Sequence, residues 1–328
     1  MKLCHTLLEN RQGCYHLVSI SHECTFMKPP YLKSMLATCL SLTMSLAIPV
    51  LAQDNAQHEG VSVGNMSIMR KFAPTGTLEK QAAAQYTQTL QQAQQQRALG
   101  PDDHPQVIRL RGIAKKLIPF ALPWNERAKD WKWEVNLLGS KQINAYCMPG
   151  GKIAFYSGIL DILKLTDDEV AIVMGHEIAH ALREHGAERA GKAAVANFGV
   201  KLAEIVAAAK GYDPSIAGTV AGGLANASML KFSRDDETEA DVVGLEIAAR
   251  AGYDPRAGVS LWQKMGMVNK NSPPQWLSTH PAGKTRIDEI RRHFPEVMPL
   301  YARAKSMPLD RIPAYQTNVK GIAPVSYP

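Results

Sequence analysis

The chain has 328 residues, of which 45 % are hydrophobic, 20 % are charged and 7 % are aromatic. This balance is typical of a globular protein and excludes a disordered or collagen-like chain. The formal net charge of +7 is small for this length, and no block of Lys and Arg accompanies it, so we expect no nucleic-acid partner. The length allows one large domain or two smaller ones.

The first 52 residues are expected to be a leader. An apolar, uncharged run follows two lysines and ends in small residues, which is the pattern of a secretory signal peptide over 27–52. Met27 is interpreted as the natural start, which makes residues 1–26 an over-extended beginning without a function. Two alternatives stay open, namely an uncleaved membrane anchor and a lipoprotein attached through Cys39.

Cleavage after Ala52 predicts a periplasmic mature chain with a single cysteine, Cys147. A single cysteine cannot form an internal disulfide, so packing must hold the core together. We interpret Cys147 as a small buried hydrophobic residue.

The remaining chain reads as a flexible polar lead-in over 53–77, one domain over 78–300 and an extended tail over 301–328. A Gln- and Ala-rich segment without helix breakers predicts a helix over 78–99, and a second helix is predicted over 105–119. The segment 215–230 is rich in Gly and Ala and is interpreted as a tightly packed internal helix. Short apolar segments predict strands over 131–138, 143–147 and 152–156. Almost everything after the last strand has a helical pattern. The expected fold class is therefore α+β, mostly helical with a small β-sheet.

The sequence His176-Glu177-Ile178-Ala179-His180 carries the chemistry. On a helix the two histidines lie one turn apart on one face, so both imidazoles can point to one metal ion. Glu177 is rotated from them by about 100°, which reaches a water on the metal rather than the metal itself. This is the histidine pair and general base of a zinc hydrolase. The alternative is a hydrogen-bonded histidine pair in an ordinary core.

The helix that carries this motif is predicted to begin after a capping box formed by Thr166 and Glu169, and to continue to Gly186. On such a helix His185 lies about 140° round from His180 and cannot join the pair. A more distant carboxylate must therefore supply the third ligand.

An acidic segment opens a second helix, which is predicted over 233–250. Glu237 and Asp241 share one face of it, so Glu237 can bind the metal while Asp241 accepts the N–H of a ligating histidine. Glu239 points another way and is expected to be solvated. The alternative is an ordinary helix N-terminus whose acids favour the helix dipole.

In order and spacing these segments resemble the M48 family of zinc metallopeptidases, gluzincins that include the membrane-embedded HtpX and Ste24 proteases and soluble periplasmic members similar to BepA and LoiP. Unlike HtpX and Ste24, the expected mature chain shows no membrane-spanning run, and unlike BepA it shows no helical repeats. The matching residues are Asn144-Ala145, Pro149-Gly150-Gly151-Lys152-Ile153, the His176–His180 motif, Ser233-Arg234 with Glu237 and Asp241, Ser278-Thr279-His280-Pro281, and Arg286-Ile287.

The resemblance implies a gluzincin-type domain that binds one Zn²⁺ through the histidine pair and Glu237, with Glu177 as the catalytic base. It also implies that His280 approaches or coordinates the zinc as a fourth ligand and can hold the enzyme latent. The alternative for His280 is an N-cap before Pro281. Arg286 is expected to support the site or stabilise the oxyanion, or else to form a structural ion pair.

An extended substrate could add to the edge strand near Asn144 and Ala145. Recognition through the main chain favours unfolded or misassembled envelope proteins as substrates, with a peripheral association with the outer membrane or its assembly machinery. The alternative function is a zinc-stabilised periplasmic chaperone or assembly factor with little proteolytic activity.

Overall fold

The computed structural model describes residues 59–209, 232–268, 275–280 and 285–327. The predicted leader and the helix predicted over 215–230 lie outside these residues. The 3-10 helices are η1 (Ile68–Phe72), η2 (Leu122–Trp124), η3 (Glu126–Asp130) and η4 (Leu309–Arg311). The strands are β1 (Glu134–Leu138), β2 (Ala145–Met148) and β3 (Lys152–Tyr156).

The α-helices of the described residues account for most of the secondary structure, so the α+β, mostly helical class is confirmed. They are α1 (Thr75–Gln95), α2 (Pro105–Ala121), α3 (Ser157–Leu163), α4 (Asp167–Leu182), α5 (His185–Ala209), α7 (Arg234–Arg250), α8 (Ala257–Val268), α9 (Gln275–Thr279), α10 (Arg286–Arg292) and α11 (Phe294–Ala304).

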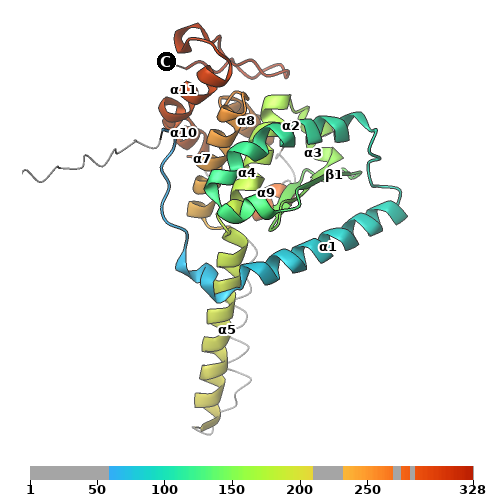
Figure 1. Cartoon of the computed structure of the whole chain (residues 1–328), viewed down its shortest axis with the longest axis vertical. Helices are drawn as coiled ribbons and strands as arrows, with labels where there is room; N and C mark the ends of the chain where they lie inside the picture. The colour runs from blue at the N-terminus through green and yellow to red at the C-terminus, as the bar shows by residue number, and fades with distance from the viewer. Residues whose placement is uncertain (1–58, 210–231, 269–274, 281–284, 328) are drawn as a thin grey trace, which may run out of the picture. The chain divides into compact units, whose positions relative to one another are not determined.

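The three strands form one sheet in the order β1-β3-β2 (Figure 1). β3 pairs parallel with β1 and antiparallel with β2, which leaves β2 at an edge. The turn between β2 and β3 contains Gly150 and Gly151 with φ of 84° and 75°, a conformation that a side chain would strain. The central strand β3 is paired on both sides, so a further strand could pair only with an edge strand, β1 or β2.

Helix α4 lies in the middle of the domain, in contact with β2, α2 and α7 (Figure 1). It begins with the predicted capping box, in which the Thr166 hydroxyl accepts from the Glu169 N–H and the Glu169 carboxylate accepts from the Thr166 N–H. Its residues from Glu169 to Leu182 are all buried. The motif therefore lies on a helix that is packed against its neighbouring elements and buried along this part of its length.

The helix predicted to reach Gly186 ends at Leu182 instead, because the chain turns sharply before α5. Glu184 has a positive φ of 56° in this turn, and its carboxylate pairs with Arg70 at 2.7 Å. Arg183 donates a short hydrogen bond to the carbonyl of Gly64. The predicted angle of 140° between His180 and the next histidine therefore does not apply.

The predicted lead-in over 53–77 is described from residue 59 onward, and this part contacts the domain. The N–H of Val61 donates to Glu246 at 2.7 Å, and Val61 is buried. At the other end of the chain Tyr315 pairs with Val325, and both side chains are buried. No helix within the described ranges has the length and apolar character needed to cross a membrane.

Candidate metal centre

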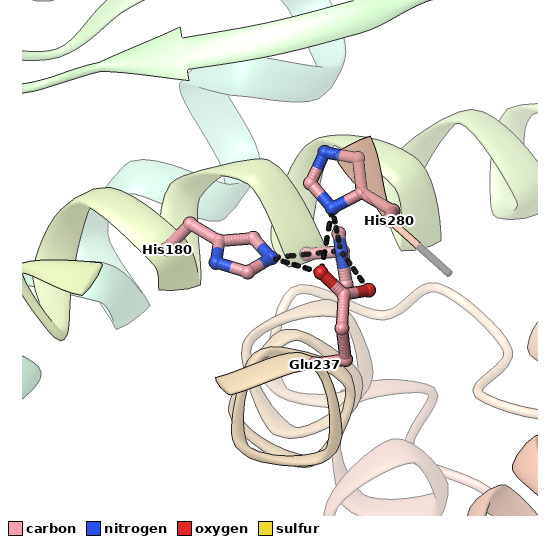
Figure 2. A group of neighbouring side chains, drawn as sticks. His180, Glu237 and His280 are labelled. Atoms are coloured by element: carbon pink, nitrogen blue, oxygen red, sulfur yellow. Dashed lines mark hydrogen bonds and ion pairs between the residues drawn. The ribbon is translucent and has the colours of Figure 1, made fainter. Parts of the chain in front are cut away.

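Four side chains from three parts of the chain converge on one point inside the domain. They are His176 and His180 of α4, Glu237 of α7 and His280, which follows α9. One donor atom from each lies within 4.8 Å of all the others, and each residue is at most 4 % exposed. Figure 2 shows the labelled His180, Glu237 and His280 pointing toward one another.

The spacing of the donor atoms fits a tetrahedral zinc ion. Bonds of about 2.0–2.1 Å place ligand atoms about 3.3–3.4 Å apart. The Nε2 atoms of His176 and His180 lie 3.1 Å apart. Nδ1 of His280 lies 3.3 Å from Nε2 of His176. Oε1 of Glu237 lies 3.4 Å from Nε2 of His180 and 2.9 Å from Nδ1 of His280.

The partner of Nδ1 of His176 explains why Nε2, the nitrogen that faces the centre, is an acceptor. Nδ1 lies 2.9 Å from Oδ1 of Asp241, so it carries the proton and Nε2 carries a lone pair. Asp241 is fixed in turn by Arg286, which donates to its two oxygens at 2.5 and 2.7 Å. Asp241 thus lies beside the nitrogen of His176 that faces away from the centre.

His180 has a different outer partner, which the sequence reasoning missed. Its Nδ1 lies 2.8 Å from Nδ1 of His185, whose Nε2 lies 2.8 Å from Oε2 of Glu239. Glu239, predicted to be solvated, also accepts from Arg183 at 2.5 Å. That prediction is wrong because the break after α4 turns His185 back toward the first turns of α7, where Glu239 lies.

The charges around Glu237 favour its ionised form. Burial by itself would raise the pKa of Glu237, but hydrogen bonds from His180 and His280 lower that pKa far below its usual range. Arg286 donates to its second oxygen at 2.6 Å. Burial lowers the pKa of His180 well below its usual range, so the ring is neutral. A carboxylate and neutral imidazoles are the forms that bind a metal.

Arg286 lies beside the donor cluster and contacts two of the carboxylates there. Its hydrogen bonds reach Asp241 and Glu237, and its guanidinium lies 4.1 Å from the ring centroid of Trp262. Arg286 is 7 % exposed. The buried ion pairs of Arg286 with Asp241 and Glu237 are therefore the same contacts through which it would support the site.

Glu177 lies next to the cluster and is held by a residue that the sequence reasoning did not identify. Nε1 of Trp276 donates to Oε1 of Glu177 at 2.6 Å, and Trp276 is 1 % exposed. The same carboxylate oxygen lies 3.6 Å from Nε2 of His280. Trp276 precedes His280 by four residues, and this helical spacing could have indicated that both face one site.

The edge strand lies close to this same segment. The backbone N–H of Trp276 donates to the carbonyl of Ile143 at 3.1 Å, just before β2. Asn144 caps the start of the strand, since its side-chain oxygen accepts from the N–H of Ala145 at 3.0 Å. Ala145 is buried and pairs with Phe155 of β3. The segment before His280 therefore contacts both the base and the start of the edge strand.

The sequence of this domain matches the model of peptidase family M48 over residues 110–293, which is more than half of the chain. The chain belongs to peptidase family M48. The matched region includes all four converging side chains, Glu177 and Arg286. The resemblance inferred from the motifs is thereby confirmed.

The chain is similar to proteins that are named as metalloendopeptidases or proteases. The chain is 33 % identical over 201 residues to mitochondrial metalloendopeptidase OMA1 of Schizosaccharomyces pombe, covering 60 % of this chain and 55 % of the relative. It is 31 % identical over 228 residues to OMA1 of Saccharomyces cerevisiae, covering 64 % and 62 %. It is 30 % identical over 173 residues to the beta-barrel assembly-enhancing protease of Yersinia pestis, covering 50 % and 35 %. The chain thus spans between about a third and less than two thirds of the length of these relatives.

Proposed function

We propose that this chain is a zinc-dependent endopeptidase that hydrolyses peptide bonds in unfolded or misassembled envelope proteins. The observation that carries the proposal is the convergence of His176, His180 and Glu237 at tetrahedral spacing beside Glu177. Membership of a metallopeptidase family and relatives named as metalloendopeptidases support it.

The residues divide the chemistry between them. His176, His180 and Glu237 would hold the zinc, which when bound would supply the positive charge that polarises a peptide carbonyl and lowers the pKa of a water. Glu177 accepts the proton of that water and delivers it to the leaving amine. Its position one residue after His176, on a buried helix, holds it beside the metal position throughout.

The described arrangement has the features of a latent form. Two contacts support this: Nδ1 of His280 lies 3.3 Å from Nε2 of His176 and would take the fourth donor position, and Nε1 of Trp276 donates to Oε1 of Glu177. Four protein donors around zinc are typical of a closed site, whereas a catalytic site keeps one position open. We infer that release of His280 and Trp276 accompanies activity.

The proposed location is the periplasm. It is supported by the pattern of the predicted signal peptide over 27–52 and by a bacterial relative that is named for assembly of beta-barrels. The proposed partners are unfolded or misassembled envelope proteins, and the proposed association with the outer membrane or its assembly machinery is peripheral. Asn144 and Ala145 near the edge strand are the proposed start of the substrate-binding strand.

The substitution Glu177→Gln tests the role of the base. We expect it to retain zinc, because Glu177 is outside the donor set, and to lower the casein digestion of the opened variant His280→Ala by at least about 10²-fold through loss of the proton acceptor. Zinc content by atomic absorption and the rate of casein digestion are measured together. Cleavage by the zinc-loaded double variant His280→Ala/Glu177→Gln at the rate of His280→Ala would contradict the mechanism.

The substitution His280→Ala tests latency and distinguishes the proposal from the second candidate function. We expect casein digestion to rise because the fourth position opens. The double variant His280→Ala/Glu177→Gln is the control, and it must remain inactive. The closed donor set also fits a zinc-stabilised chaperone or assembly factor, and that function is favoured if the wild type and His280→Ala both bind zinc but neither digests casein.

A further inference from the structure

The two histidines of the motif differ in how their outer nitrogens are held. Nδ1 of His176 meets the carboxylate of Asp241 directly at 2.9 Å. Nδ1 of His180 meets another imidazole, that of His185, at 2.8 Å. Ligating histidines need such an outer partner because it fixes the tautomer and orientation of the ring.

The position of the metal determines which nitrogens carry protons along the path from His180 through His185 to Glu239. If Nε2 of His180 faces the metal, its proton lies on Nδ1, and Nδ1 of His185 must be the acceptor. The proton of His185 then lies on Nε2, which donates to Oε2 of Glu239 at 2.8 Å. Each hydrogen bond is therefore made with one donor and one acceptor, and a carboxylate ends the path.

The backbone and the packing hold this path in place. The turn at Glu184, with its positive φ of 56°, starts α5 so that His185 is 1 % exposed beside His180. Phe232 stacks on the ring of His180 with centroids 3.9 Å apart. Glu239 pairs with Arg183 at 2.5 Å and lies at the wall of a cavity of about 540 Å³.

We propose that His185 and Glu239 form a positioning pair for His180, equivalent to the role of Asp241 for His176. The pair sets the tautomer and orientation of His180 and thereby the affinity for the metal. This inference rests on the proposed zinc site, but it assigns a role to two residues outside the donor set.

The test measures metal affinity rather than activity. Zn²⁺ affinity is determined by chelator competition, and the ligand field is determined from the visible absorption of the Co²⁺-loaded protein. We expect His185→Ala to weaken Zn²⁺ binding by about 10–100-fold and to change the Co²⁺ bands. His185→Asn places an amide oxygen near the position of Nδ1, so we expect it to restore affinity to within about threefold of the wild type.

A matched control is His293→Ala, because His293 also contacts a carboxylate, that of Glu296 at 2.8 Å, but lies outside the cluster. We expect it to leave Zn²⁺ affinity unchanged. Glu239→Ala should weaken binding less than His185→Ala, since the imidazole itself remains. Circular dichroism of each variant shows whether it is folded.

The outcomes separate this inference from the proposed function. Zn²⁺ binding by His185→Ala as tight as that of the wild type, or by His185→Asn as weak as that of His185→Ala, would overturn the positioning role and leave the peptidase proposal intact. A wild-type protein without Zn²⁺ affinity would overturn both. Near-wild-type Zn²⁺ affinity of His185→Asn together with weak binding by His185→Ala would support the inference, even if the Ala variant is partly unfolded.

Discussion

At the scale of single residues, the site consists of donors and of the groups that hold them. Asp241 and Arg286 hold His176 and Glu237, while Trp276 holds Glu177. The tryptophan is the contact that most directly limits the base, because an oxygen that accepts an indole N–H is less available to a water. A hydrogen bond to a charged group contributes about 1.5–3 kcal/mol.

The substitution Trp276→Phe removes this N–H and retains an aromatic ring. We expect casein digestion to rise by about tenfold, the equivalent of about 1.4 kcal/mol, with unchanged zinc content. Trp262→Phe is the control, since Trp262 packs against Trp276 with ring centroids 5.4 Å apart. Activity of Trp276→Phe at or below the wild-type level would show that the contact does not restrain the base.

At the scale of elements, the close approach of α4 and α7 brings the histidines and Glu237 together. The two helices cross at a pair of glycines. A Cβ on Gly244 would lie 2.6 Å from the backbone nitrogen of His176, and a Cβ on Gly175 would lie 2.8 Å from the carbonyl oxygen of Gly244. Only glycine permits this separation, so the backbone itself sets the distance between the ligands.

The substitution Gly244→Ala should force the helices apart. We expect it to lower the free energy of unfolding by about 2 kcal/mol or more and to weaken Zn²⁺ binding, because Glu237 moves with α7. Gly112→Ala is the control: Gly112 lies in α2 with no atom within 4 Å of an added Cβ. It should instead stabilise the protein by about 0.5–1 kcal/mol.

Urea unfolding and chelator competition measure both effects. Equal stability of the two alanine variants would contradict the role of the crossing.

At the scale of the whole described domain, a buried ion pair joins the motif helix to the end of the chain. Lys264 of α8 donates to Glu169 at 2.6 Å and to Asn318 at 2.8 Å. Thr317 also donates to Glu169 at 2.8 Å. The capping carboxylate of α4 is therefore shared by α8 and the segment after α11, which ties the predicted tail to the domain.

Removal of the cation tests this connection. We expect Lys264→Met to lower the free energy of unfolding by about 3–5 kcal/mol, because the carboxylate of Glu169 would remain buried without its partner. Lys201→Met is the control, since its pair with Glu204 is exposed, and it should cost at most about 0.5 kcal/mol. A loss below 1 kcal/mol for Lys264→Met would show that hydrogen bonds from Thr317 and Thr166 suffice.

The sequence by itself determined what is local or periodic. The spacing of His176 and His180 and the capping box at Thr166 follow from the geometry of one helix, and the spacing of Glu237 and Asp241 follows from another. A side chain at a given position of a regular helix has a known direction, so these parts could be predicted without the fold.

The tertiary structure decided the contacts between segments that no period relates. His185 lies beside His180 only because the chain turns at Glu184, and Trp276 reaches Glu177 only because α9 packs near the start of β2. Such contacts depend on breaks in regular structure and on packing across long sequence separations. A helical pattern contains no information about either, and this is the physical reason why the roles of His185, Glu239 and Trp276 became visible only in the folded chain.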